Sequence, residues 1–241
     1  MLILALDSST SVVTVAVARA GEAAPGASAA RREVLAEISV PSRDASEALL
    51  PAAHAALNLA GADFGEVEHI LAGVGPGTFT GIRIALAAAR ALALATGAAL
   101  SRNSTLNALA APASLDAGNP DVLAVLDAKR HQVFAQCFAS DGIRGEILCV
   151  APGELAAQLP ARDESREKDT LLVGEGALCY REALSGLGRI PADASPLHRV
   201  TATGHVFSAD LAPVPAVEVV PLYVREPDAE VRRNLNPWSR S

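Results

Sequence analysis

The residues of this 241-residue chain that could hold a phosphate group follow two apolar runs, each of which ends in an aspartate. The first run leads into the polar turn Asp7, Ser8, Ser9 and Thr10, and the second leads into the turn 127–130. Glycines in such a turn let backbone N–H groups surround an anion. Neither turn contains glycine, so we expect at most weak binding through the hydroxyls of a vestigial phosphate loop at 7–10. Asp7 is either a magnesium- or water-positioning carboxylate or the polar end of a strand.

A glycine-rich loop over 73–81 is the second candidate for anion binding. It lacks the terminal Gly-Lys-Ser/Thr of a Walker loop and the spacing of a dinucleotide fingerprint. Its glycines either adopt positive φ or let another backbone segment approach closely. The signature positions of the loop are Gly75, Pro76, Gly77, Thr78, Thr80 and Gly81.

The loop continues into a helix, predicted over 82–95, that is apolar nearly all round. Such a helix must be covered on nearly all sides. It is either a central core helix, or its own fold covers one side and a partner protein covers the other. A second apolar helix is predicted to begin after Asp44 and to stop at Gly61. The predicted partner interface on these two helices consists of Leu49, Leu50, Ala53, Leu57, Phe79, Ile82, Arg83, Leu86, Ala89 and Arg90.

Patterns typical of catalytic and metal sites are missing from the sequence. The five histidines show no i, i+4 pair, the three cysteines show no Cys-x-x-Cys spacing, and there is no Gly-x-Ser-x-Gly elbow. We therefore predict no catalytic residue and no metal ligand.

Composition limits the location and the partners of the chain. Half of the residues are hydrophobic and the formal net charge is −7. An acidic chain binds nucleic acid poorly by itself, because that affinity depends on Lys and Arg at phosphates. No basic leader precedes the first strand, and we expect no membrane span and no membrane partner. The expected location is therefore cytoplasmic.

Apolar patterns predict two similar halves, each opening with a strand, an aspartate, a turn and a returning strand. The predicted strands cover 2–6, 12–18, 34–40, 69–73, 121–127, 132–138, 147–150 and 171–174, and further helices cover 153–159, 177–184 and 201–211. The first predicted subdomain is 1–105, which contains the partner-binding helices and which 214–225 either completes or does not. The second subdomain is 106–213, and a polar tail covers 226–241.

Several of these segments resemble the TsaB (YeaZ) family. The strongest likeness lies in 73–94 and the next in 4–10, and it continues through 104–106, 122–138 and 220–225. Ala45 departs from the pattern, since the family is expected to have histidine there. The resemblance implies an α/β, degenerate actin-like or ribonuclease H-like fold with two similar subdomains, each a mixed sheet flanked by helices.

The resemblance also implies a function. TsaB proteins are non-catalytic subunits in the threonylcarbamoyl modification of adenosine next to the anticodon, in tRNAs that read codons beginning with A. The implied partners are a TsaD-like catalytic subunit, a TsaE-like ATPase and, in isolation, a second copy, with tRNA reached through the complex. No cofactor is expected in the chain itself, and ATP or ADP at the partner complex stays open. The alternatives are a stand-alone actin-like kinase or ATPase and a glycoprotease-like metallopeptidase.

Overall fold

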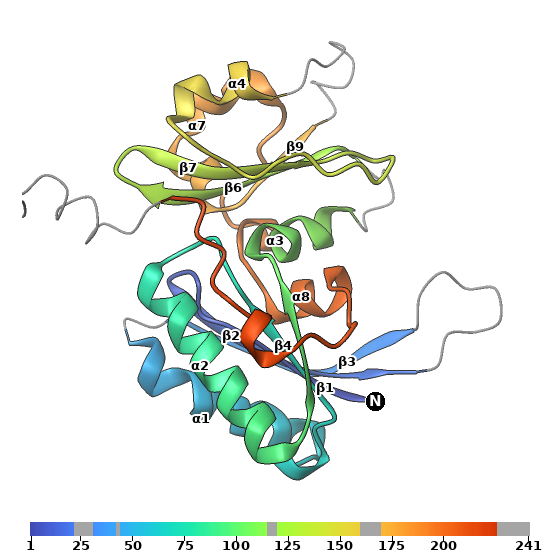
Figure 1. Cartoon of the computed structure of the whole chain (residues 1–241). Coiled ribbons are helices and arrows are strands. Elements are labelled where there is room, and N and C mark those ends of the chain that lie inside the picture. Colours follow the sequence, from blue (N-terminus) through green and yellow to red (C-terminus); the bar gives the residue numbers. More distant parts are fainter. Residues whose placement is uncertain (22–30, 42–43, 115–119, 160–169, 226–241) are drawn as a thin grey trace, which may run out of the picture.

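The computed structural model describes residues 1–21, 31–41, 44–114, 120–159 and 170–225, which form two lobes stacked on each other (Figure 1). The polar tail and the charged loop over 160–169 lie outside the described residues. Each lobe is built on one mixed sheet with helices against it. This confirms the predicted α/β class with a mixed sheet in each half.

The first lobe contains a five-stranded sheet in the order β3-β2-β1-β4-β5. Its strands are β1 (Leu2–Asp7), β2 (Val12–Ala20), β3 (Arg32–Pro41), β4 (His69–Gly73) and β5 (Ala99–Asn103). β1 pairs antiparallel with β2 and parallel with β4. The helices α1 (Ala45–Ala60) and α2 (Phe79–Thr96) cover one face, where alternate residues of β1 such as Leu4 and Leu6 enter the core.

The second lobe contains a four-stranded sheet in the order β8-β7-β6-β9. Its strands are β6 (Val122–Lys129), β7 (Gln132–Phe138), β8 (Leu148–Val150) and β9 (Leu171–Val173). The hairpin β6–β7 and its parallel neighbour β9 repeat the arrangement of β1, β2 and β4. The short helices α4 (Leu155–Gln158), α6 (Glu175–Cys179) and α7 (Arg181–Leu184) cover the outer face.

Two helices fill the space between the sheets, as Figure 1 shows. α3 (Thr105–Ser114) packs against the second sheet through Leu106 and Leu109. α8 (Ala202–Ser208) packs against the inner face of the first sheet, where Ala202 and Val206 meet Ile3 and Ala16. A helix from the predicted range 106–213 therefore completes the core of the first lobe.

The sequence-based elements agree with the structure except at a few places. β5 and α3 were not predicted, because this alanine-rich stretch, which Pro112 interrupts, shows no clear apolar period. α2 begins at Phe79, three residues earlier than predicted, and the helix expected over 177–184 is two short helices. The first helix ends as predicted at Gly61, whose φ of 68° favours glycine.

Among the described residues, α2 is the helix that is long and apolar enough to cross a membrane by length and composition alone. The sequence analysis expected no membrane span and did not identify this helix as one that meets the length and composition of a span. Its residues Ile82, Ala85, Leu86 and Ala89 pack in the core of the first lobe, as those of an ordinary core helix do.

Candidate functional site

The aspartate of the first turn is hydrogen-bonded entirely within the protein. Asp7, at the end of β1, is fully buried, and its Oδ1 accepts hydrogen bonds from the backbone N–H and the Oγ of Ser9, both at 2.7 Å. His205 on α8 places Nε2 2.9 Å from Asp7 Oδ2. Burial raises the pKa of Asp7, but His205 and Ser9 outweigh it and hold the pKa below its ordinary value. Both carboxylate oxygens are thus used inside the protein, and the carboxylate serves as a buried link between β1 and α8.

The glycine-rich loop packs directly against this turn. The N–H of Thr78 donates to the carbonyl of Ser9 at 2.6 Å, and Ser8 Oγ donates to the carbonyl of Gly81 at 2.8 Å. A Cβ at Gly77 would lie 2.2 Å from the Ser9 carbonyl oxygen, and one at Gly81 would lie 1.9 Å from that of Ser8. These glycines permit backbone contact between the loop and the turn, which is one of the two roles predicted for them, and the loop forms no anion cradle.

The remaining predicted positions of the loop and turn surround this contact. Gly75 has a φ of 97°, which only glycine adopts readily. Pro76 is buried and, with Thr10, lines the cleft between the lobes, and Thr80 is exposed at the start of α2. The structure therefore brings the two predicted motifs together as one packed unit.

The second aspartate turn is also satisfied internally. Asp127 accepts hydrogen bonds from the N–H and the ammonium of Lys129, both at 2.8 Å, and from the hydroxyl of Tyr180 at 3.3 Å. Desolvation raises the pKa of Asp127, but the contacts with Lys129 and Tyr180 hold it below its ordinary value. At this turn the Lys129 N–H, which could bind a phosphate, donates to Asp127 instead. The Ser9 N–H donates to Asp7 in the same way at the first turn.

Both turns open onto a cleft of about 560 Å³ between the lobes. Its walls also include apolar side chains of Phe79, Leu126 and Phe134. Two carboxylates face it, since Glu175 lines it together with Asp127, and burial raises the pKa of Glu175. Lys129 and Arg225 line the cleft as well, so it presents both carboxylates and cations. The N–H groups of Ser9 and Lys129 are bound to Asp7 and Asp127, so each turn offers a phosphate fewer N–H donors than a glycine-rich turn does.

The predicted interface residues on α1 and α2 divide into two sets. Six of them lie in the core of the first lobe, and their side chains pack against the sheet rather than at the surface: Leu49, Ala53, Leu57, Ile82, Leu86 and Ala89. Leu50, Phe79, Arg83 and Arg90 are exposed. The outer face of these helices also contains residues that the sequence analysis did not select.

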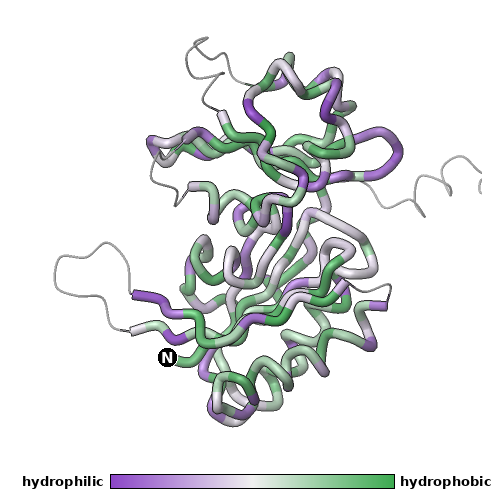
Figure 2. Tube along the Cα trace, turned by 180° about the vertical axis from the view of Figure 1, so that it is seen from behind, coloured by the Kyte–Doolittle hydropathy of each residue, from purple (hydrophilic) through white to green (hydrophobic). Residues whose placement is uncertain are grey.

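This outer face is apolar. On α2, Leu94 is 89% exposed, and Ala87 and Ala91 are exposed on the same side of the helix. On α1, Leu50 is 47% exposed and Leu59 is 71% exposed, on opposite sides of its buried stripe. Figure 2 shows hydrophobic colouring along much of both helices. Of the α2 residues, 28% are buried: the sheet covers one side of the helix, and segment 214–225 contacts it through Arg83 and Arg90. We call Ala87, Ala91 and Leu94, which share one side of α2, the outer helix face.

The charged residues of α2 hold the C-terminal segment of the chain. The guanidinium of Arg83 lies 3.6 Å from the ring centre of Phe79, and its Nε donates to the hydroxyl of Tyr223 at 2.8 Å. The rings of Phe79 and Tyr223 stack with centres 5.4 Å apart. Arg90 donates to the carbonyl of Val219 at 2.7 Å. Both arginines thus bind this chain itself, a role that the sequence did not indicate.

The sequence analysis also missed the polar network around Asp7. Asn103 Nδ2 lies 3.3 Å from His205 Nδ1 and 2.7 Å from Ser208 Oγ, and Thr105 Oγ1 lies 2.9 Å from Ser9 Oγ. A histidine within the short apolar helix predicted over 201–211 was the available signal, but its partner lies 198 residues away. The described residues contain no cluster of three or more His, Cys, Asp or Glu side chains that could hold a metal ion.

Comparisons with known proteins agree with this architecture. A family model described as TsaD, tRNA N6-adenosine threonylcarbamoyltransferase, matches residues 36–160. An uncharacterized protein of Mycobacterium tuberculosis strain H37Rv is 31% identical over 230 residues, which are 95% of this chain and 93% of that protein. The tRNA threonylcarbamoyladenosine biosynthesis protein TsaB of Escherichia coli K12 is 31% identical over 134 residues, 56% of this chain and 53% of that protein.

A solved structure extends the likeness to the whole chain. YeaZ from Pseudomonas aeruginosa superimposes with a TM-score of 0.72 at 26% identity, covering 92% of this chain and 99% of that one. The duplicated strand–aspartate–hairpin units and this match together confirm the predicted degenerate actin-like fold.

Proposed function

The chain belongs to the TsaB (YeaZ) family of actin-like proteins, and from this premise we propose that it is a non-catalytic partner of a TsaD-type catalytic subunit. Its similarity to TsaB gives it a role in tRNA threonylcarbamoyladenosine biosynthesis. The proposal adds how the chain contributes: it holds the catalytic subunit in its productive shape and carries no catalytic residue of its own.

The observation that carries this proposal is the outer helix face. An apolar helix face that is exposed to solvent is typical of protein interfaces. Small residues beside Leu94 allow a partner helix to approach α2 closely. A helix that is apolar nearly all round, as α2 is, is normally covered on most of its sides. A TsaD-type subunit covers this face in the complex, and a second copy of the chain covers it when the chain is alone.

The geometry of the two aspartate turns supports the non-catalytic part. Asp7 is fully buried and bound by His205 and Ser9, and Asp127 is bound by Lys129 and Tyr180. The fact that protein groups already bind both carboxylates supports a non-catalytic role for these turns. Any ATP or ADP is therefore bound at the partner complex rather than by these turns.

The remaining partners follow from the same assembly. A TsaE-like ATPase joins the complex as a third protein. tRNA contacts the complex rather than the isolated chain, because a net charge of −7 opposes binding to phosphates. The assembly works in the cytoplasm, where tRNA is modified.

The experiment is a binding titration of the full chain against a purified TsaD-type subunit. Leu94→Glu places a charge on the outer helix face without disturbing the core, because Leu94 is 89% exposed. We expect affinity to fall about tenfold or more, since a buried unpaired charge is costly at an interface. Ile143→Glu is the matched control, an exposed apolar residue on the other lobe.

Equal affinity of Leu94→Glu and the unmodified chain would remove the outer helix face as the contact. Light scattering of the same variants gives the state of the isolated chain, and Leu94→Glu is expected to be monomeric. A further measurement is ATP hydrolysis by the isolated chain. Hydrolysis that is present in the unmodified chain and lost in Lys129→Ala would contradict the non-catalytic role.

A further inference from the structure

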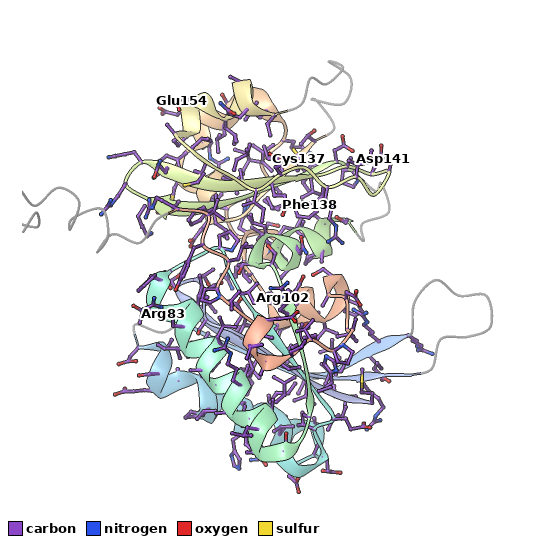
Figure 3. The ribbon with its side chains drawn as sticks, viewed as in Figure 1. Arg83, Arg102, Cys137, Phe138, Asp141 and Glu154 are labelled. Carbon is purple, nitrogen blue, oxygen red and sulfur yellow. The ribbon has the colours of Figure 1, made fainter. Side chains whose placement is uncertain are left out.

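A groove that includes neither aspartate turn opens where the two lobes meet. It consists of two adjoining hollows of about 390 and 180 Å³, which share Asn107, Arg144 and Ser208. α3 forms its floor, and Figure 3 shows Arg102 on one side of this helix and Phe138 on the other. Residues from both lobes therefore converge on one site.

The larger hollow is suited to an anion. Arg102 and Arg144 both line it and are exposed. Within the described parts of the chain, the Arg144 guanidinium makes no hydrogen bond or ion pair, and that of Arg102 donates one bond, to the carbonyl of Glu218 at 2.9 Å. Asp210 is the one carboxylate among the lining residues, and its Oδ1 already accepts from the Ala212 N–H. Two arginines with free donors form the usual protein partner of a phosphate.

The smaller hollow is suited to a flat apolar ring. Its walls include Phe138, Phe207, Ala110 and Ala111. Phe207 is 43% exposed, and no aromatic stacking partner lies beside it in the described structure. Exposed aromatic rings next to arginines are the surfaces on which nucleic-acid bases stack.

We propose that this groove binds a nucleotide, with its phosphate between Arg102 and Arg144 and its base against Phe207. A nucleotide joins an anion to a flat ring, which is the pairing of chemistries that the two hollows present. The source is either a free nucleotide or one unstacked nucleotide of an RNA. This site goes beyond the proposed function and does not depend on it, since it lies away from the outer helix face.

Calorimetric titration of the full chain with AMP tests the site, with adenosine and inorganic phosphate as half-ligands. We expect AMP to bind about tenfold or more tightly than either half. Arg144→Ala should weaken AMP binding about tenfold or more, as expected when charge-assisted hydrogen bonds are removed. Phe207→Leu keeps an apolar side chain but removes the ring, and it should weaken AMP while leaving phosphate binding unchanged.

Two variants control for other sites. Arg199→Ala removes an exposed arginine that lines neither hollow, and Lys129→Ala removes one of the two cations that line the cleft between the turns. Both should bind AMP as the unmodified chain does, and melting temperatures check the fold of all four variants. No AMP binding, AMP binding no tighter than that of its halves, or binding lost in Lys129→Ala but kept in Arg144→Ala overturns the proposal.

A short single-stranded RNA then identifies the source. If the RNA competes with AMP and Arg144→Ala weakens this competition, the groove binds a nucleotide of RNA. If AMP binds but the RNA does not compete with it, the groove binds a free nucleotide. No TsaD-type subunit is present in these measurements, so their failure would leave the proposed function intact.

Discussion

At the scale of single residues, the Asp7–His205 pair is the most consequential contact in the molecule. Both side chains are fully buried, and they join the first strand of the chain to its last helix. The arrangement resembles part of a catalytic network, yet no face of either side chain reaches solvent. A buried pair of this kind determines which segments pack together. Removing either side chain leaves the other as a buried polar group without its partner.

Replacing His205 by alanine should therefore destabilise the fold strongly. The variant His205→Ala leaves the Asp7 carboxylate buried without its Nε2 partner, a loss of about 3–5 kcal/mol in other proteins. Urea denaturation measures the free energy of unfolding. His54→Ala, on the exposed surface of α1, is the matched control and should lie within about 0.5 kcal/mol of the unmodified chain. A His205→Ala value equally close to the unmodified chain would contradict the structural role of the pair.

The free energy of unfolding should also depend on pH in acid, because of the same Asp7 carboxylate. The folded pKa of Asp7 lies below its ordinary 3.8, so the unfolded chain binds the proton more tightly. The resulting stabilisation is fully present above pH 3.8 and is lost as the pH falls through the folded pKa. The free energy of unfolding of the unmodified chain should therefore exceed that of Asp7→Asn by more at about pH 6 than at about pH 3. A gap that stays constant over this range would mean that the pKa of Asp7 is unchanged by folding.

At the scale of elements, the C-terminal segment 214–225 is an external strap on α2. Arg83 and Tyr223 anchor one end of the strap and Arg90 holds its middle, while the Leu222 N–H donates to the carbonyl of Val74 at 2.8 Å. Because Val74 lies in the glycine-rich loop, the strap, the loop and α2 form one connected unit beside the cleft. The two arginines that the sequence analysis placed in the partner interface also fasten this unit.

The variant Arg83→Ala should loosen the strap without unfolding the lobe. An exposed cation–π contact contributes about 0.5–1 kcal/mol and a hydrogen bond about 1 kcal/mol. Hydrogen exchange at the Leu222 amide should accelerate several-fold, and exchange at the Leu4 amide in β1 should not change. Arg199→Ala, an exposed arginine elsewhere, serves as the control. Equal acceleration at both amides would indicate global destabilisation rather than release of the strap.

The elements also show what could be predicted from the sequence. β1, β2 and α1 have clear local signals, namely an apolar run ending at Asp7, a valine-rich return and a glycine stop at Gly61. The glycines of the loop allowed close approach by some backbone segment, but the sequence did not identify the first turn as that segment. β5 and α3 were missed because alanine fits helix, strand and core equally well, so a stretch rich in alanine carries little periodic signal.

The inner and outer faces of α1 and α2 could not be separated from the sequence for a related reason. Leu57 and Leu59 are both apolar and two residues apart, yet one is 1% exposed and the other 71% exposed. Only the position of the sheet decides which of them is core. The outer helix face therefore emerges from the structure, and Leu94, its most exposed member, was not among the residues selected from the sequence.

At the scale of the whole molecule, the two lobes do not follow the order of the chain. α8 comes from the second half of the sequence but covers the inner face of the first sheet, where it meets Ile3, Ala5 and Ala18. α3, which lies beside it, covers the second sheet. This exchange could not be predicted from the sequence, because contacts between residues about 200 positions apart leave no local pattern.

A chain that ends at residue 105 should therefore fail to fold as an independent lobe. Its five-stranded sheet would keep α1 and α2 on one face but would expose Ile3, Ala5, Ala16 and Leu71 on the other, and the buried Asp7 would lose His205. We expect it to bind a hydrophobic dye and to unfold without a cooperative transition. Joining residues 200–225 to it through a flexible linker restores α8 and the strap, and this chain should unfold cooperatively. A third chain with the same linker but only 214–225 tests whether the strap alone suffices; cooperative unfolding of that chain or of 1–105 would show that α8 is dispensable and that the first lobe is complete without it.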